Sequence, residues 1–422
     1  MAVTTIPWGD GTNDNIYLSR NASEGNQTVT VSSDANAGAA RSKVVTFSAN
    51  GASPVTLTVI QAAGGSVTPV FYDWLLFDGN AYIDTDIQPE QNSSYQVNLG
   101  GELNLAAQRL FRVSSSDGTY IFAYLSSETS ASQRVIGIYY NSASAVASRN
   151  LLWGYPSYGF FLTPKGQGTG DSYSAFTKGS GSPNGNLVIG SNESHNGNPY
   201  SGAMGVFKIY DSSAEDAETF SQLSGFTPYK TLKPCTYNGQ DGLWNDEEGK
   251  FYGNSAGSGT LTACSRSQVT PSSYDSNDKA YYSLGNASNA YAGYSSTSYC
   301  TMALVRGSQA ESYVYFKFNT SAIPSDATIL RVVCSIGLAK SSTNSNVIAK
   351  ATAQLCSGTT TKGTATSITS NNRTMYRMDC GTWTRQELDD VRIKLYGKRG
   401  SSNANNNHII YLYGATLQVF WK

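Results

Sequence analysis

The chain has 422 residues, a formal net charge of −1 at pH 7 and only 14% charged residues, so it lacks the basic excess that recruits nucleic acid. Glycine (41 residues) and tyrosine (28 residues) are abundant and apolar residues reach 39%, which favours turns and pleated strands over helices or disorder. The sequence has no run of eighteen apolar residues, so no membrane insertion is expected.

Residues 1–66 are predicted to form a small β-sandwich. The stretch opens with "MAVTTIPWGDGTNDN", which has neither the basic nor the apolar region of a secretory signal. Short strands are expected in "TVTVSSD", "RSKVVTFSAN" and "VTLTVIQ", where Val55, Leu57 and Val59 alternate with threonines and Ile60. The order of these strands, with Arg41 before "VVTF", resembles the BACON-type immunoglobulin-like domains. That resemblance implies an anchor or spacer, with sugar binding as the alternative.

Residues 67–266 are predicted to form a jelly roll. The segments "YIDTDI", "GVFKIYD" and "GLWNDEEGKFYGNSAGSG" resemble, in that order, the concanavalin A-like domains of the LamG and pentraxin type. The resemblance implies that an early strand at 82–87 lies against a late strand at 205–211, and that the last segment forms a hairpin. Residues 126–186 match weakly, and no strands are assigned to them.

Asp78, Asp84 and Asp86 fall within nine positions and raise the question of a calcium or catalytic site. Residues 82–87 alternate, with Tyr82, Asp84 and Asp86 on one side of a strand, so the two strand aspartates stand about 7 Å apart. A calcium ion needs several oxygens around one point, which a straight strand cannot supply alone. A solvated strand face or turn capping is therefore expected, and no metal site is predicted.

Residues 267–422 are predicted to form a second jelly roll. Alternation in "ESYVYFKFN", "VRIKLYGK" and "GATLQVFWK" predicts strands, with Leu417, Val419 and Trp421 on one side of the last. Thr384 and Glu387 have the spacing of a capping box at the start of a short helix. The segment resembles a C-terminal jelly roll of phage structural proteins, akin to DNRLRE-type and carbohydrate-binding-module sandwiches. The fold class is thus all-β, with three tandem β-sandwich domains.

No catalytic constellation is evident. The two histidines, His195 and His408, lie in asparagine-rich stretches, and the sequence lacks HExxH, GxSxG and P-loop motifs. A concanavalin-like glycoside hydrolase would carry ExDxxE, whereas the acidic runs here are "SAEDAETF" and "WNDEEGK". The six cysteines form no CxxC pair, and buried free thiols or disulfides remain open. No enzyme activity and no cofactor are predicted.

Aromatic side chains in polar surroundings are the candidate binding residues. Sugars stack their C–H faces on aromatic rings, and tyrosine-rich surfaces also serve protein contacts. Candidate glycan-binding residues, each with burial in the core as the alternative, are Trp153, Tyr155, Tyr158, Tyr200 and Trp244.

The interpretation that joins these features is a surface-exposed phage structural protein. A head fibre, capsid decoration or tail-fibre component assembles in the bacterial cytoplasm and needs no export signal. Its expected partners are other virion proteins, a second copy of the chain in a homo-oligomer, and host or mucus glycans. The alternatives are a bacterial carbohydrate-binding surface protein and, less favoured, a glycoside hydrolase.

Overall fold

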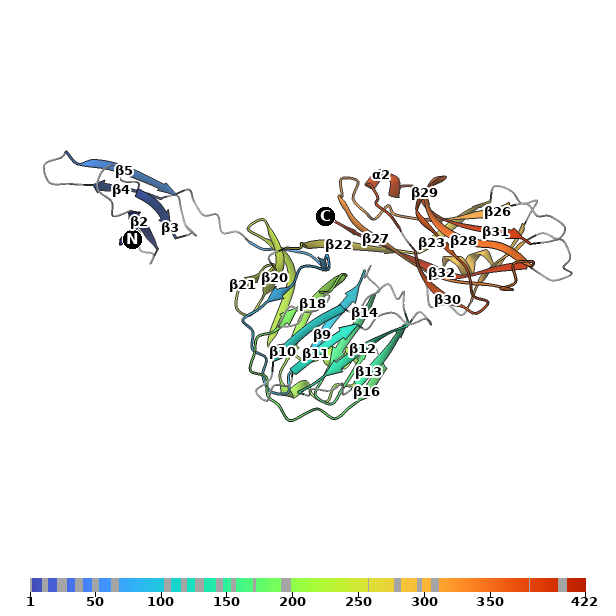
Figure 1. The fold of residues 1–422 in the computed structure, drawn as a ribbon, viewed down its shortest axis with the longest axis horizontal. Coiled ribbons are helices and arrows are strands. Elements are labelled where there is room, and N and C mark those ends of the chain that lie inside the picture. Colours follow the sequence, from blue (N-terminus) through green and yellow to red (C-terminus); the bar gives the residue numbers. More distant parts are fainter. Residues whose placement is uncertain are drawn as a thin grey trace. The chain divides into compact units, whose positions relative to one another are not determined.

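A computed structural model shows a chain that forms two compact units, Met1–Pro69 and Val70–Lys422. The structure describes residues 2–9, 14–20, 29–34, 41–47, 53–61, 68–101, 108–114, 120–125, 133–141, 147–152, 157–169, 172–190, 199–256, 258–276, 282–293, 298–304, 311–378, 380–400 and 408–422. Nearly every element is a strand, so the predicted all-β fold class is confirmed (Figure 1).

The first unit contains a three-stranded sheet, β1-β2-β3, and a two-stranded sheet, β4-β5. Its strands are β1 (Ala2–Pro7), β2 (Asn15–Arg20), β3 (Val29–Ser33), β4 (Arg41–Phe47) and β5 (Val55–Gln61). Its core is small, with Trp8, Ile16, Leu18 and Val45 buried. The guanidinium of Arg41 lies 4.5 Å from the centre of the Trp8 ring and its Nε donates to Gln61. Val55 remains 66% exposed, because a core of this size does not reach that end of β5.

Two facing sheets form a sandwich in the first half of the second unit. The first sheet has the order β13-β12-β11-β10-β17-β8, and the second runs β16-β15-β14-β9-β18-β7, with β19 pairing β18, β20 and β6. The first sheet contains β8 (Ile83–Asp84), β10 (Gln108–Ser114), β11 (Tyr120–Leu125), β12 (Gln133–Tyr139), β13 (Ala147–Leu152) and β17 (Val188–Ile189). The second contains β6 (Val70–Phe71), β7 (Trp74–Phe77), β9 (Ser94–Gly100), β14 (Ser157–Leu162), β15 (Gly166–Thr169), β16 (Ser172–Ala175), β18 (Ala203–Tyr210), β19 (Lys230–Tyr237), β20 (Gln240–Asn245) and β21 (Lys250–Tyr252). The helical turns η1 (Ser212–Ala214) and α1 (Phe220–Ser224) follow β18.

A second sandwich occupies the C-terminal half of this unit. One sheet contains β24 (Tyr282–Gly285), β25 (Cys300–Leu304), β27 (Ile329–Lys340), β30 (Thr374–Met378) and β32 (His408–Trp421). The other contains β23 (Pro271–Ser276), β26 (Glu311–Phe318), β28 (Ile348–Ser357), β29 (Thr360–Ser367) and β31 (Val391–Arg399), in the order β23-β26-β31-β28-β29. The helical turns are η2 (Ala287–Tyr291) and α2 (Arg385–Leu388).

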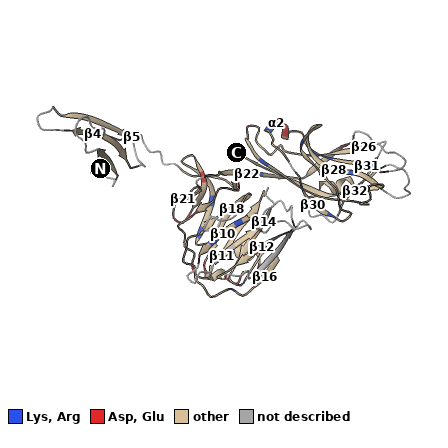
Figure 2. Cartoon of the chain, viewed as in Figure 1, with Lys and Arg blue, Asp and Glu red and all other residues tan. Residues whose placement is uncertain are grey.

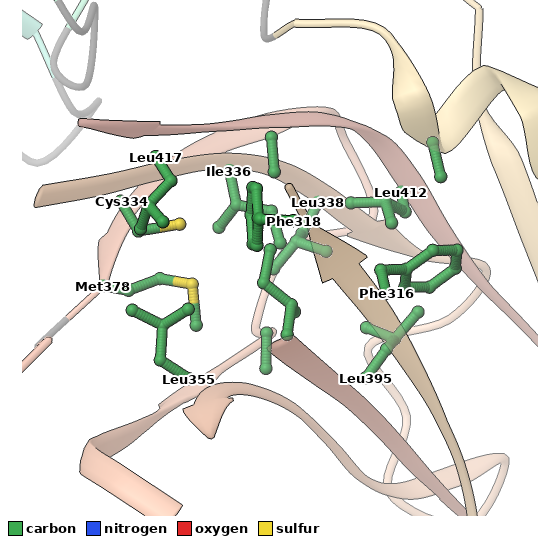
Figure 3. Close-up of a cluster of buried hydrophobic side chains, with 14 of the residues drawn as sticks. Phe316, Phe318, Cys334, Ile336, Leu338, Leu355, Met378, Leu395, Leu412 and Leu417 are labelled. Carbon is green, nitrogen blue, oxygen red and sulfur yellow. The ribbon is translucent and has the colours of Figure 1, made fainter. Parts of the chain in front are cut away.

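Side chains from both C-terminal sheets meet in one core. Figure 3 shows Phe316 and Leu395 from one sheet opposite Ile336, Leu412 and Leu417 from the other. These residues are fully buried, as the alternation in "ESYVYFKFN" and "VRIKLYGK" predicts. The predicted capping box is also confirmed, because Thr384 Oγ1 accepts from Glu387 N and Glu387 Oε2 accepts from Thr384 N.

One long strand, β22 (Leu261–Val269), belongs to both sandwiches. Its first half pairs with β7, from Leu261 opposite Phe77 to Cys264 opposite Trp74, and its second half pairs with β32. The predicted domain boundary at 266/267 falls inside this strand (Figure 1). Next to it a small apolar cluster joins the sandwiches, formed by Trp74, Leu76, Ala203, Cys264, Val333 and Phe420.

Both faces of β32 are buried near the C-terminal end of the strand. Leu417 and Val419 face the C-terminal core as predicted, but Gln418 and Phe420 on the other side are also fully buried. The guanidinium of Arg331 donates to the carbonyl oxygens of Gly101 (3.0 Å) and Phe77 (3.3 Å) across the same junction. The second face of β32 is therefore covered by the neighbouring sandwich and not by solvent.

The strand at residues 82–87 and the late strand at 205–211 belong to the two facing sheets, and Ile83 and Phe207 contribute to the same buried cluster. The β8 strand pairs with β17, whereas β18 pairs with β7, β9 and β19 in the opposite sheet. The alternation itself is confirmed: Ile83, Thr85 and Ile87 are buried, while Asp84 and Asp86 are exposed. Side chains alternate in extended backbone whether or not a ladder continues beside them, so the pattern fixed the buried face without fixing the partner strand.

Candidate functional site

The β19–β20–β21 hairpin extends the second sheet of the first sandwich and carries the aromatic side chains of the candidate site. The turn between β19 and β20 uses Asn238 (φ 51°) and Gly239 (φ 74°), both in the left-handed region. Asn-Gly is the preferred pair for such a two-residue hairpin turn. The predicted hairpin in "GLWNDEEGKFYGN" is confirmed as β20 and β21, which pair Trp244 with Phe251.

Register places four aromatic residues on the outer face of this hairpin. Lys233 lies opposite Trp244, Trp244 opposite Phe251, and Phe71 of β6 opposite Cys235. Residues two apart on a strand point to the same side, so Tyr237 shares this face. The opposite side is apolar core, since Leu232, Leu243 and Tyr252 belong to the buried cluster of the sandwich. The hairpin aromatic face is defined here as Phe71, Lys233, Tyr237, Trp244 and Phe251.

The rings of this face lie close together. The Tyr237 ring centroid lies 5.2 Å from that of Trp244 and 5.5 Å from that of Phe251. Gly242 makes room for them, because a Cβ there would come within 2.8 Å of the Phe251 ring. Tyr237, Trp244 and Phe251 are partly exposed and Phe71 is 48% exposed. The result is an aromatic surface that is contiguous and open to solvent.

A single basic side chain lies within the hairpin aromatic face. The Lys233 ammonium lies 5.5 Å from the centre of the Phe71 ring and forms an ion pair with Asp246. Beneath the rings, burial raises the pKa of the Cys235 thiol to about 12, with a contribution from Asp241. The thiol is therefore protonated at neutral pH and acts as a small apolar filler. The face suits a neutral ligand with C–H surfaces, because its one charge is already paired.

The other predicted glycan-binding residues do not join this face. Tyr200 is fully buried, its hydroxyl donates to the carbonyl oxygen of Ala203 (3.2 Å), and its ring contacts Phe77. The prediction that Tyr200 stacks on a sugar is therefore wrong, since core packing leaves no ring face accessible. Tyr158 is half-buried against the core of the sandwich, and Trp153 and Tyr155 lie outside the described residues.

Asp78 and Asp86, two of the three aspartates at residues 78–86, have structural partners, while Asp84 is exposed. Asp78 accepts from the backbone nitrogens of Asn80 (2.8 Å), Ala81 (3.1 Å) and Thr260 (2.7 Å), which makes it a turn cap. Asp86 forms an ion pair with Lys250 and accepts a hydrogen bond from Tyr252. The expected strand face with turn capping is confirmed. Within the described ranges, no group of three or more histidine, cysteine or acidic side chains is arranged to hold a metal ion.

The acidic runs considered for glycoside hydrolysis are likewise engaged in structural contacts. Lys165 pairs with Glu215 and Asp216, and Lys230 pairs with Glu248. His408, predicted in a loop, begins β32 and is buried, whereas His195 lies outside the described residues. The six cysteines are buried free thiols, which decides between the two alternatives left open by the sequence.

We compared the chain with protein families, curated proteins and solved structures, and two similar solved structures are described here. No protein-family model and no curated protein matches the chain. A heptameric SAP-like pentraxin from Limulus polyphemus is 13% identical, with a TM-score of 0.30, over 36% of this chain and 80% of that one. Domains LG4-5 of the mouse laminin alpha1 chain are 9% identical, with a TM-score of 0.27, over 82% of this chain and 84% of that one. Neither likeness carries a ligand or a partner over to this chain.

None of the helices in the described part of the chain has the length and apolar character of a membrane span. Charged side chains are sparse on the strands, as Figure 2 shows by the predominance of tan ribbon.

Proposed function

We propose that this protein is a non-enzymatic, surface-exposed binding protein that contacts neutral glycans through the hairpin aromatic face. The observation that carries the proposal is the contiguous surface of Tyr237, Trp244, Phe251 and the 48%-exposed Phe71. Aromatic faces carry negative potential and attract the C–H groups of sugar rings, and a group of exposed apolar side chains marks a binding surface more often than a single one does.

The biological setting we propose is a phage particle, with this protein as a head fibre, capsid decoration or tail-fibre component. The support is the order of segments in the last 156 residues, which resembles phage structural jelly rolls, together with a chain made of β-sandwiches. In this setting the first unit acts as the anchor or spacer. Other virion proteins and further copies of the chain are its protein partners.

The absence of enzyme activity is part of the proposal. The acidic side chains that a glycosidase would use are held by lysines, as with Glu215 and Asp216 at Lys165. A carboxylate that is engaged in an ion pair is less available to act as the general acid or nucleophile that hydrolysis requires. Hydrolysis of a bound oligosaccharide by the wild-type protein would contradict this part.

The deciding experiment is a neutral-glycan array probed with wild type, Trp244→Ala and Phe71→Ala, with light scattering on the same samples. We expect weak binding that each substitution reduces about fivefold, since one lost stacking contact is worth about 1 kcal/mol. Phe226→Ala is the matched control, because Phe226 is 37% exposed and lies outside the face. Equal binding by all four proteins would refute the proposed site.

Light scattering separates the two settings. A stable oligomer of the full chain is the outcome expected of a virion component. A monomer with clear, saturable sugar binding would instead favour a bacterial carbohydrate-binding surface protein.

A further inference from the structure

The outer face of the β23-β26-β31-β28-β29 sheet carries tyrosines and lysines in regular rows. Tyr313 of β26 lies opposite Tyr396 of β31, and Tyr315 lies opposite Lys394. Lys350 of β28 lies opposite Lys398 of β31. Successive rows are two residues apart, or about 7 Å. The Tyr313–Tyr396 row is thus flanked by a lysine row on each side.

The lysines rest against the tyrosine rings. The Lys394 ammonium lies 4.6 Å from the centre of the Tyr313 ring, and the Lys350 ammonium lies 5.5 Å from that of Tyr396. Such contacts hold an ammonium group in place while leaving its outer side open to water. Lys350 is exposed, and Lys394, Tyr313 and Tyr396 are partly exposed. We name Tyr313, Tyr396, Lys350 and Lys394 the basic tyrosine face.

Charge on this sheet is only partly neutralised. Arg392 donates to Asp390 (2.6 Å and 2.7 Å) and to Asp275 (3.1 Å), so its guanidinium is fully engaged. Lys398 pairs with Glu311 at 3.8 Å. Among the described residues, Lys350 and Lys394 form no ion pair. Two positive charges therefore remain available on either side of a pair of tyrosine rings.

We propose that the basic tyrosine face binds acidic polysaccharides, with sugar rings on Tyr313 and Tyr396 and anionic groups on Lys350 and Lys394. The tyrosines supply stacking surface, with the Tyr396 hydroxyl already bonded to Glu311, and the lysines supply charge-assisted hydrogen bonds. The site lies in the other sandwich from the hairpin aromatic face and selects charged sugars. The two faces share no residue, so loss of binding at one does not affect the proposal for the other.

A polysaccharide fits this face better than a nucleic acid. A nucleic acid presents one phosphate per nucleotide, and its affinity comes from neutralising many phosphates at once. Among the described residues two lysines of this face form no ion pair, and the whole chain has a net charge of −1. Asp275 and Glu311 lie on the same face, opposite Tyr315 and Lys398, and they pair with Lys317 and Lys398. These acids repel a continuous run of phosphates more than the widely spaced carboxylate or sulfate groups of a polysaccharide.

The test is binding of the full chain to immobilised alginate and to dextran sulfate at 50 mM and 300 mM salt. These probes separate carboxylate from sulfate recognition, and neutral dextran and single-stranded DNA complete the set. We expect saturable binding to one or both acidic polysaccharides that weakens with salt. The Lys350→Gln/Lys394→Gln variant should lose affinity on the order of tenfold, since it lacks two charge-assisted contacts. Tyr313→Leu should lose affinity for the same probe with an unchanged salt dependence.

Lys340→Gln is the matched control, because Lys340 ends β27 in the opposite sheet of the same sandwich. Circular dichroism of each variant checks that the fold is retained, which the conservative lysine changes should preserve. The proposal is overturned if the double variant binds like wild type, if neutral dextran binds equally well, or if single-stranded DNA is the tightest ligand.

Discussion

The indole ring of Trp74 meets the phenyl ring of Phe420 edge-on, with ring centroids 6.2 Å apart. The two residues come from different sandwiches, and the Arg266 guanidinium also packs on the indole, with its Cζ 4.2 Å from the ring centre. Gly101 lies against the Phe420 ring so closely that a Cβ there would approach it to 2.7 Å. The Trp74–Phe420 ring pair therefore packs in the apolar cluster that joins the two sandwiches beside β22.

Removing the Phe420 ring should destabilise the second unit strongly. Phe420→Ala is expected to lower the free energy of unfolding by about 3–5 kcal/mol, because it leaves a cavity among fully buried neighbours. Urea unfolding followed by tryptophan fluorescence measures this loss. Phe71→Ala is the matched control, since Phe71 is 48% exposed and should cost less than about 1 kcal/mol. Similar losses in the two variants would show that the junction contributes little.

The capping box of α2 provides a smaller, local prediction. Thr384→Ala should destabilise the protein by about 1 kcal/mol, because Glu387 N loses the acceptor that caps the helix. Thr384→Ser keeps a hydroxyl and should restore most of the loss. Thermal unfolding of the three proteins makes the comparison, and equal melting temperatures for the alanine and serine variants would contradict the assignment.

Asp86 links stability weakly to pH. Hydrogen bonds from Lys250 and then Tyr252 hold the pKa of this carboxyl below its usual value of 3.8. A lowered pKa in the folded state gives stability that is present above pH 4 and is lost as the pH falls through the folded pKa. The pair is largely exposed, so the contribution at pH 7 is about 0.5 kcal/mol or less.

The measurement is the unfolding free energy of wild type and Asp86→Asn at pH 7 and at pH 2.5. The variant should be slightly less stable at pH 7, and its difference from wild type should be smaller at pH 2.5. A difference that grows on acidification would have the wrong sign for this ion pair.

The buried thiols should be unreactive in the folded protein. Burial raises the pKa of the Cys264 and Cys300 thiols to about 12, and Cys334 is fully enclosed in the C-terminal core. Because the thiolate is the reactive form, a disulfide reagent at pH 8 should modify essentially none of the six until denaturant is added. Rapid modification of one cysteine in native buffer would show that its surroundings open without global unfolding.

Sequence pattern predicted the buried face of individual strands well. Alternation identified Val314, Phe316 and Phe318 as core, and Ile83 and Ile87 in the other sandwich. The pattern reports only which side of a strand is apolar, which is a local property. It did not predict that Phe420 is buried, because Thr416 and Gln418 on the same side of the strand are polar, although the neighbouring sandwich covers that side.

Of the residues that form the hairpin aromatic face, the sequence analysis named only Trp244. Trp244 was named, but its neighbours Tyr237 and Phe251 reach it only through the pairing of three strands, and Phe71 comes from 173 positions earlier in the chain. The Asn238-Gly239 turn was a usable signal, since it fixes the register between β19 and β20. Tyr200 was misassigned because a tyrosine in a polar stretch is compatible with both core and surface.

The shared strand β22 determines how mechanical force would be transmitted between the two sandwiches. A tether between two sandwiches is usually the first place to extend under load. Here the connection is itself a strand, paired with β7 on one half and β32 on the other. Traction on the C-terminal sandwich must therefore shear one of these two ladders of backbone hydrogen bonds before the halves separate. The two halves of this unit are therefore expected to bear load through backbone pairing and not through a slack linker.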